Sequence, residues 1–224
     1  MCYNLKKPIY FFMPNLKTKI IIFDFDGTIA DSFLTLIEIV NELGKAECLG
    51  VFSADQIEKA RDLPMREIIF QLKISKWKLF FLARKIQKKF AQKISQVSPV
   101  AEMIPTLQEL KKNGFVLGVL SSTRKEILEQ FMKNNKIDVF TFIHSERNLF
   151  GKAKILKKIL KEYHFDSSEA IYVGDESRDI DASREANMRI AAVSWGFNSR
   201  KMLEKNHPDY LFDKPKELLT LKNS

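Results

Sequence analysis

The chain has 224 residues, of which 45% are hydrophobic and 29% charged, the composition of a globular protein that can bury a sizeable core. Its apolar runs stay below the roughly 18 residues that span a bilayer, which excludes membrane insertion. The net charge of +9 is concentrated in one window, because eight lysines and arginines and no acidic residue lie between Glu67 and Glu102.

The first 18 residues are expected to form a loose N-terminal extension. Their apolar patch, residues 9–13, lies between Pro8 and Pro14 and is too short for the core of a signal peptide. Met13 is an alternative start. Two cysteines in the whole chain are too few for a disulfide framework, so we expect a protein of the reducing cytoplasm.

The folded core is expected to begin at residue 19. The uninterrupted apolar run from Ile20 to Phe23 predicts a strand that is buried on both faces and ends at Asp24. Ser32 is a suitable N-cap for the helix that follows this strand, and Gly44 is a suitable end for it.

From residue 33 to residue 97 the pattern is helical and contains no clear strand. Ser53 is predicted to cap one helix and Pro64 to begin another. The longest predicted helix runs from Ser75 to Ile94, with apolar residues at helical spacing on one side and lysines on the other. We interpret residues 33–97 as an inserted, all-helical cap subdomain.

Beyond the cap, predicted strands and helices alternate. The predicted helices are 104–112, 124–134, 152–163 and 178–186, and the predicted strands are 115–120, 139–143, 170–173, 189–193 and 210–212. Repeated β-α units with right-handed crossovers form a parallel sheet flanked by helices. The predicted fold class is therefore α/β, a Rossmann-like core of residues 19–32 and 98–224 that carries the cap.

Two carboxylates follow the first predicted strand, in the sequence Asp24-Phe25-Asp26-Gly27-Thr28. Ligands of open α/β sheets bind at the carboxyl ends of the strands, so these side chains are candidate site residues. A turn alone would account for Asp26-Gly27, because aspartate and glycine favour turns. It does not account for Asp24, which directly continues a buried strand.

Polar residues also follow two further strands and begin one helix. Ser121 and Ser122 follow the second strand, where hydroxyls and amides at a helix start can hold an anion, although an ordinary N-cap explains them equally well. Lys152 begins a helix, a position where a lysine is more often solvated than catalytic. Asp175 and Asp179 follow the fourth strand, where a capping aspartate is the structural alternative.

Taken together and in this order, these residues resemble the four motifs of the haloacid dehalogenase superfamily, each at the end of the expected element. The matching motifs are Asp24-x-Asp26-Gly-Thr, Ser121, Lys152 and Gly-Asp175-x3-Asp179. Segments 23–32, 172–175, 193–197 and 208–210 are similar to the phosphoglycolate phosphatase-like branch. The helical block between the first two motifs occupies the position of the cap in that branch.

The resemblance implies a phosphatase that forms an aspartyl-phosphate on Asp24. Asp26 would protonate the leaving oxygen and then deprotonate the water that hydrolyses the intermediate. Ser121, Ser122 and Lys152 would bind the phosphoryl oxygens, with Ser122 standing where relatives often carry asparagine.

A metal is expected at the same place. Three carboxylates would repel a phosphate dianion strongly unless a divalent cation and Lys152 neutralise them. Hard oxygen ligands, with no thiolate or imidazole set, point to Mg²⁺. By resemblance, the ligands are the Asp24 carboxylate, the Asp26 backbone carbonyl and Asp175, with Asp179 orienting bound water or Lys152.

The expected partner is a small phosphorylated metabolite, namely a phosphoglycolate-like, sugar or nucleotide monoester. In the branch that the chain resembles, specificity lies mainly in the cap. Arg61 and Arg66 of the cap are therefore candidate contacts to the rest of the substrate.

Three alternatives share parts of this pattern. A phosphomutase of the same branch shares every motif, whereas a dehalogenase has no use for the proton-donating Asp26. The basic helix, with Trp77, Phe80 and Phe81, allows a nucleic-acid or anionic-membrane binder with a vestigial site. We interpret that helix as a solvated outer face over an apolar stripe, or as a source of positive potential that draws in anionic substrates.

Overall fold

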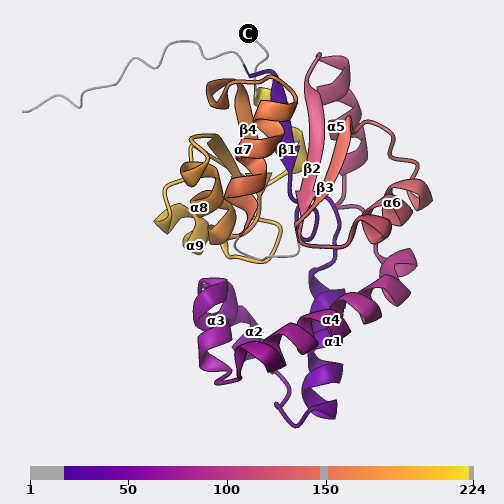
Figure 1. Cartoon of the computed structure of the whole chain (residues 1–224), viewed down its shortest axis with the longest axis vertical. Coiled ribbons are helices and arrows are strands. Elements are labelled where there is room, and N and C mark those ends of the chain that lie inside the picture. Colours follow the sequence, from indigo (N-terminus) through magenta and orange to yellow (C-terminus); the bar gives the residue numbers. More distant parts are fainter. Residues whose placement is uncertain (1–17, 147–150, 222–224) are drawn as a thin grey trace, which may run out of the picture.

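A six-stranded parallel sheet forms the centre of the protein, whose computed structural model describes residues 18–146 and 151–221 (Figure 1). Nearly all of the expected N-terminal extension lies outside the described residues. The strands follow the order β3-β2-β1-β4-β5-β6 across the sheet. Their bounds are β1 Ile20–Phe23, β2 Val116–Ser121, β3 Phe142–Ser145, β4 Ala170–Gly174, β5 Arg189–Val193 and β6 Tyr210–Phe212.

Strand β1 lies in the middle of the sheet, paired with β2 on one side and β4 on the other. All four of its residues are fully buried, as the apolar run predicts. Successive side chains of a strand point to opposite faces, so Ile21 and Phe23 join one hydrophobic cluster, and Ile20 and Ile22 join another.

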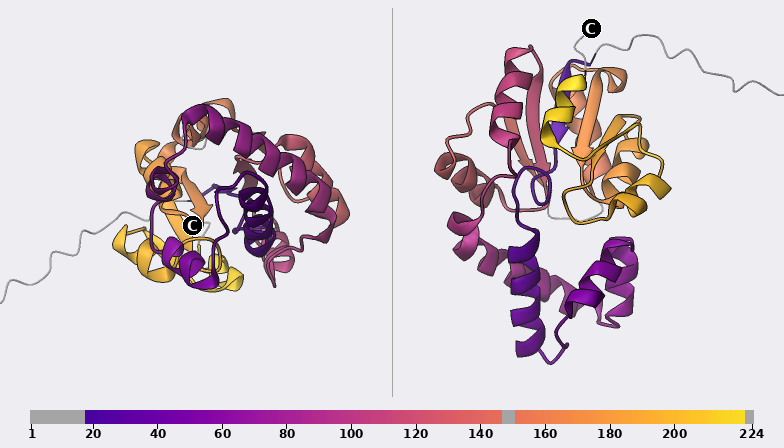
Figure 2. Two further views of the ribbon diagram at one scale, coloured as in Figure 1. Left: turned by 90° about the horizontal axis from the view of Figure 1, so that it is seen from below. Right: turned by 180° about the vertical axis from the view of Figure 1, so that it is seen from behind.

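Helices cover both faces of this sheet (Figure 2). Side chains of α5 and α6 fill the first hydrophobic cluster, and side chains of α7, α8 and α9 fill the second. The bounds of these helices are α5 Met103–Lys112, α6 Lys125–Asn134, α7 Lys152–Glu162, α8 Ser177–Glu185 and α9 Arg200–Lys205. The predicted fold class, an α/β protein with a Rossmann-like parallel sheet, is confirmed.

The predicted strand over residues 139–143 is displaced along the chain. Pairing with β2 begins at Phe142, and β3 extends to Ser145. Val139 is buried in the hydrophobic core without belonging to the ladder. An apolar side chain can pack inside a loop as well as in a strand, so the local pattern misplaced the start of β3.

A second group of helices, here called the cap segment (residues 33–93), lies beyond the carboxyl ends of the strands (Figure 1). Its helices are α1 Phe33–Ala46, α2 Ala54–Arg61, α3 Met65–Gln71 and α4 Lys76–Lys93. Ser53 caps α2 as predicted, because its Oγ accepts a hydrogen bond from the Gln56 amide. Pro64 immediately precedes α3. The division into a core and a cap of residues 33–97 stays a prediction.

The expected end of α1 is wrong. The helix does not end at Gly44 but continues to Ala46, and Gly44 lies inside it. A side chain there would bring its Cβ to 2.3 Å from the Gly50 carbonyl oxygen, so close approach of the backbone requires the glycine. Ser32 is the N-cap residue as predicted, but its side chain makes no capping hydrogen bond, and its hydroxyl donates to the Asp26 carboxylate (3.0 Å).

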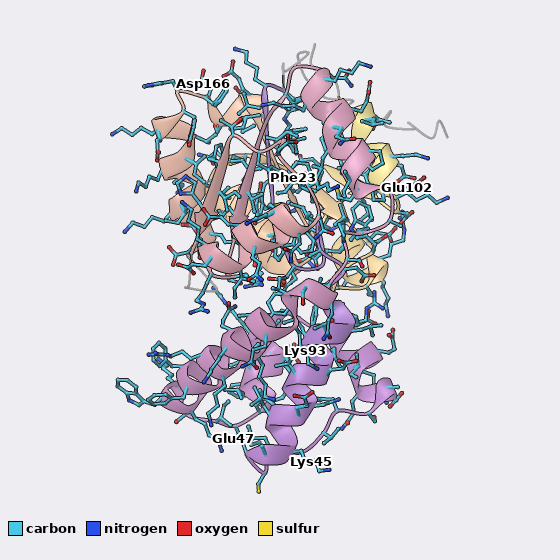
Figure 3. The ribbon with its side chains drawn as sticks, turned by 90° about the vertical axis from the view of Figure 1, so that its right-hand side faces the viewer. Phe23, Lys45, Glu47, Lys93, Glu102 and Asp166 are labelled. Carbon is cyan, nitrogen blue, oxygen red and sulfur yellow. The ribbon has the colours of Figure 1, made fainter. Side chains whose placement is uncertain are left out.

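Some lysines of α4 are paired with glutamates inside the cap segment. Lys93 and Glu47, labelled in Figure 3, take part in such pairs with other partners. Helices α1 and α4 pack together through apolar residues that include Ile39 and Phe90. Three lysines on this surface also lie beside glutamates of α1. The ion pairs are Lys85–Glu47, Lys89–Glu42 (2.7 Å), Lys93–Glu42 (3.0 Å) and Lys93–Glu38 (3.3 Å).

The outer side of α4 carries large exposed side chains. Trp77 is 75% exposed, and Phe80 and Phe81 are about half exposed. The Arg84 guanidinium lies over the Phe80 ring at 5.7 Å from its centroid. Within residues 18–146 and 151–221, no helix combines the length and the apolar character that crossing a membrane requires.

Candidate active site

The predicted site residues lie at the carboxyl edge of the sheet, on the side of the cap segment (Figure 1). Asp24 directly follows β1, and its amide continues the pairing with β4 by donating to the Val173 carbonyl oxygen (2.8 Å). Its Oδ1 accepts a hydrogen bond from the Phe25 amide (2.7 Å). Asp24 is only 3% exposed, so the central strand carries a buried carboxylate at its tip.

Lys152, the first residue of α7, bridges two of the predicted carboxylates. Its Nζ lies 2.5 Å from Asp24 Oδ2 and 2.7 Å from Asp179 Oδ1. Burial by itself would lower the pKa of Lys152, but the charges of Asp179 and Asp24 outweigh burial and raise that pKa above its usual value. The solvated-lysine alternative is excluded, because the residue is 2% exposed.

Asp175 is held in a narrow cradle after β4. Its Oδ1 accepts a hydrogen bond from the Thr28 hydroxyl (2.8 Å), and its Oδ2 accepts one from the Phe197 amide (2.7 Å). A Cβ on Gly27 would lie 2.3 Å from Oδ2, and a Cβ on Gly196 would lie 2.2 Å from it. Two backbone segments therefore approach this carboxylate more closely than any side chain would permit.

Three buried carboxylates, those of Asp24, Asp175 and Asp179, meet in this place. Each offers an oxygen, and these oxygens lie within 4.8 Å of one another. Burial raises the pKa of Asp24 to about 7, against the lowering effect of Lys152. Burial, together with the nearby charges of Glu176 and Asp24, raises the pKa of Asp175 as well. One ammonium group cannot balance three carboxylates, so the cluster could hold a metal ion.

Asp26 has a different environment from Asp24. Its Oδ1 accepts from the Ser32 hydroxyl (3.0 Å), and its Oδ2 accepts from the Thr123 hydroxyl (2.6 Å). Burial raises the pKa of Asp26, and the two hydroxyl hydrogen bonds act in the opposite direction. Two carboxylates that are two residues apart thus contact an ammonium group in one case and neutral hydroxyls in the other.

The end of β2 forms a tight turn beside Asp26. Ser121 is fully buried, and its Oγ accepts a hydrogen bond from the Thr123 amide (3.0 Å). The Ser145 hydroxyl donates to the Thr123 carbonyl oxygen (2.8 Å). Arg124, rather than a serine, is the N-cap residue of α6, so the N-cap alternative does not explain Ser121. Ser122, between the two turn residues, is half-buried.

A small cavity lies where the cap segment meets α7 and α8. Its volume is about 70 Å³. Lys152 contributes to its wall, and so does Arg66 of α3. The other lining residues are Pro64, Met65, Ala153, Ser177, Arg178, Asp181, Ala182 and Glu185. Arg66 is therefore placed beside the predicted site, and the expectation that it contacts substrate stays a prediction.

Arg61 takes a different place from the one expected. Its Nε donates to the Phe197 carbonyl oxygen (3.1 Å), and its Nη2 donates to the Gly196 carbonyl oxygen (3.2 Å). The guanidinium group thus binds core backbone instead of pointing into the cavity wall. The expectation of a substrate contact from Arg61 is not supported by this geometry.

Four residues that contact the predicted site were not singled out from the sequence. Thr28 and Ser32 stand within or beside the first motif, so hydroxyls that close to two carboxylates were a usable signal. Thr123, through its hydroxyl on Asp26, and Asn198, through its amide on the Asp175 carbonyl oxygen, contact it only because distant segments fold together. No local pattern marks such residues.

Comparison with known proteins gives the family. Residues 21–193 match the model of the haloacid dehalogenase-like hydrolase family. A phosphoglycolate phosphatase of Synechococcus elongatus is 29% identical over 202 residues, which cover 89% of this chain and 94% of that protein. The pyrophosphatase PpaX of Bacillus thuringiensis is 32% identical over 120 residues, which cover 52% of this chain and 56% of that protein.

Solved structures of other proteins are also similar to this chain. A haloacid dehalogenase-like hydrolase from Streptococcus pneumoniae is 27% identical, with a TM-score of 0.75 over 91% of this chain and 97% of that one. A predicted phosphatase from Clostridium acetobutylicum has the same fold, with a TM-score of 0.79 at 19% identity over 91% of this chain and 97% of that one. The chain belongs to the haloacid dehalogenase-like hydrolase family. The expected enzyme class, a phosphoric monoester hydrolase of the phosphoglycolate phosphatase-like branch, is confirmed.

Proposed function

We propose that this protein is a Mg²⁺-dependent phosphatase that hydrolyses a small phosphate monoester through an aspartyl-phosphate on Asp24. The observation that carries the proposal is the contrast between Asp24 and Asp26 at the tip of the central strand. Asp24 is paired with an ammonium group, which favours its charged form against the burial that raises its pKa to about 7. Asp26 is bound by two neutral hydroxyl groups instead, and burial outweighs these hydrogen bonds and raises its pKa, which suits a group that must carry a proton.

In the first step, an Asp24 carboxylate oxygen attacks phosphorus, and the bond from phosphorus to the leaving oxygen breaks. Asp26 gives its proton to that oxygen, so the product departs as an alcohol. In the second step, Asp26 takes a proton from water as the water attacks phosphorus. The bond between Asp24 and phosphorus then breaks, which releases phosphate and restores both carboxyl groups.

The buried carboxylate cluster fits Mg²⁺, because its three ligand oxygens lie within 4.8 Å and all belong to a hard donor type. Asp24, Asp175 and the backbone carbonyl of Asp26 would hold the ion. When bound, it would offset the repulsion between the cluster and a phosphate dianion. Asp179 holds Lys152 in place, which is the positioning task expected of it.

Ser121, Ser122 and Lys152 are proposed to bind the transferring phosphoryl group. Ser121 Oγ accepts from the Thr123 amide, which leaves its hydroxyl hydrogen to donate to a phosphoryl oxygen. Lys152 is already fixed by two carboxylates, so it is preorganised for charge that develops in the transition state.

The relatives are named for phosphoglycolate and pyrophosphate, and we infer that the substrate class here is a comparably small phosphorylated metabolite. We place the activity in the cytoplasm, on the ground of the low cysteine count.

The test is to trap the intermediate. The Asp26→Ala variant, given an aryl phosphate with a good leaving group, should form the phosphoenzyme but hydrolyse it slowly, because the base is missing. Intact-protein mass spectrometry should then show one added phosphoryl group, mapped to Asp24 in the digest. A burst of product without any phosphorylated Asp24 in wild type and variant would contradict the proposal.

A further inference from the structure

The turn between α2 and α3, here called the cap turn (residues 61–63), is bound to the loop after β5, here called the β5 loop (residues 196–199). The Ser199 amide and the Asn198 side-chain amide both donate to the Arg61 carbonyl oxygen, each at 3.0 Å. Asn198 is 1% exposed, so its side of this contact is shielded from solvent. The cap segment and the core thus share a partly buried hydrogen-bonded joint.

The Arg61 side chain strengthens the same joint. It donates to the carbonyl oxygens of Gly196 (3.2 Å) and Phe197 (3.1 Å) through two different nitrogens. Its guanidinium carbon lies 5.3 Å from the centre of the Phe33 ring, which in turn meets the Phe197 ring edge to face at 5.6 Å. A planar fork with five donors reaches the two carbonyl oxygens from two different nitrogens, whereas a lysine would have to reach both from one.

The β5 loop is also one wall of the Asp175 cradle. The Phe197 amide donates to Asp175 Oδ2 (2.7 Å), and the Asn198 amide donates to the Asp175 carbonyl oxygen (3.2 Å). The Gly196 carbonyl and the Phe197 amide belong to one peptide group. Arg61 therefore binds one end of the peptide whose other end holds the Asp175 carboxylate. A cation on the carbonyl oxygen polarises the peptide and strengthens its N–H as a donor.

We propose that Arg61 is a positioning residue for Asp175, and that docking of the cap turn and orientation of this carboxylate are one coupled equilibrium. The metal part of this inference rests on the proposed function, in which Asp175 is a metal ligand. Undocking the cap turn removes the guanidinium group from the peptide and loosens the amide that aims Asp175. By linkage, an ion bound at Asp175 favours the docked cap turn to the same degree.

Two measurements test the coupling, and neither needs turnover. Hydrogen exchange on the metal-free protein reports the β5 loop, and calorimetric titration with Mg²⁺ reports the affinity. In Arg61→Ala, we expect faster hydrogen exchange at the amides of the β5 loop. We also expect the Mg²⁺ affinity to fall by roughly tenfold, which is the lower end of the loss seen when a residue that supports a metal ligand is removed. Arg61→Lys keeps the positive charge but not the fork, so it should recover little of this loss.

Lys59→Ala is the matched control. It removes a cation from the same helix, and the partner of Lys59 is the exposed Asp55 of that helix rather than the core. The hydrogen exchange of the β5 loop and the Mg²⁺ affinity of this variant should equal those of the wild type. Thermal unfolding of all variants verifies that each is folded before the comparison.

The inference is overturned if Arg61→Ala leaves both the β5 loop exchange and the Mg²⁺ affinity unchanged, if Arg61→Lys restores both to the wild-type values, or if Lys59→Ala shows the same losses as Arg61→Ala. Failure of the proposed function looks different. A wild type that binds Mg²⁺ and shows the coupling, but hydrolyses no phosphate monoester, contradicts only the phosphatase. A wild type that does not bind Mg²⁺ contradicts the metal assignment. The hydrogen-exchange comparison then tests only whether Arg61 holds the β5 loop in place.

Discussion

Lys152 and Asp24 form an ion pair of 2.5 Å in the interior of the protein, although they are 128 residues apart in the chain. Their side chains are 2% and 4% exposed. Water cannot solvate either charge there, so the Asp24 carboxylate depends on Lys152, and the Lys152 ammonium group depends on Asp24 and Asp179. The same pair is proposed to serve the chemistry, and this makes its removal informative for both stability and activity.

Lys152→Met should destabilise the metal-free protein by about 3 kcal/mol or more, because it leaves two buried carboxylates without their cation. Urea unfolding measures this loss, and added Mg²⁺ should restore part of it by binding the folded form. Lys154→Met is the control, since Lys154 lies on the same helix but is exposed. Equal stability of both variants would contradict the reasoning.

Asp24→Asn should abolish turnover, because an amide is not a nucleophile toward phosphorus. Asp26→Asn should lower kcat by roughly 10²- to 10⁴-fold, the usual contribution of a general acid and base. Steady-state phosphate release on a panel of phosphorylated metabolites measures both effects, and circular dichroism verifies the fold. Near-wild-type activity of Asp24→Asn would contradict the assignment of Asp24 as the nucleophile.

The titration of Asp24 should appear in the pH dependence of stability. Burial raises the pKa of Asp24 to about 7, against the effect of Lys152, from an unfolded value near 3.8. The folded chain then binds more protons than the unfolded chain between these values, so this group's contribution is full below about pH 4 and is lost as the pH rises through 7.

The measurement is a difference between two proteins. In metal-free buffer, the free energy of unfolding of the wild type minus that of Asp24→Asn should fall as the pH rises from about 4 to 7. Mg²⁺ should flatten this dependence at the upper end, because the ion competes with the proton for the carboxylate. A difference that stays constant, or that rises with pH, is the outcome that contradicts a raised pKa.

Activity should vanish in the presence of EDTA and return with Mg²⁺. Ca²⁺ should substitute poorly, because it prefers longer bonds and more ligands than the compact cluster of Asp24, Asp175 and Asp179 provides. Phosphate release after dialysis and readdition of each ion is the measurement. Full activity of the dialysed protein would show that the reaction does not require the cluster to hold a metal.

Neutralising α4 tests whether its charge steers substrates. The change is Lys78, Lys85, Lys88 and Lys89 to glutamine. Two of these lysines are paired with α1 glutamates, so we expect only a small fall in kcat/KM at low salt, an unchanged kcat, and no difference at high salt. The free energy of unfolding should change by less than about 1 kcal/mol for each exposed pair. Identical kcat/KM values at low salt would exclude steering.

The helices of the cap segment show how far local patterns reach. The cap at Ser53 predicted where α2 begins, and apolar spacing predicted α4 nearly to the residue, because capping and amphipathic burial are local properties. The same patterns did not predict that glutamates of α1 lie beside lysines of α4. Pairs such as Lys89–Glu42 depend on how two helices are placed against each other, which short-range periodicity does not encode.

The sequence by itself determined the α/β class, the order of the motifs and the position of Asp24 at the tip of a buried strand, since each follows from apolar runs and strand ends. Only the tertiary structure decided which groups touch them. The Thr123 hydroxyl on Asp26 and the Phe197 amide on Asp175 come from distant segments that the sheet brings to one edge. Such contacts depend on through-space placement, and the sequence signals that place each strand do not extend to them.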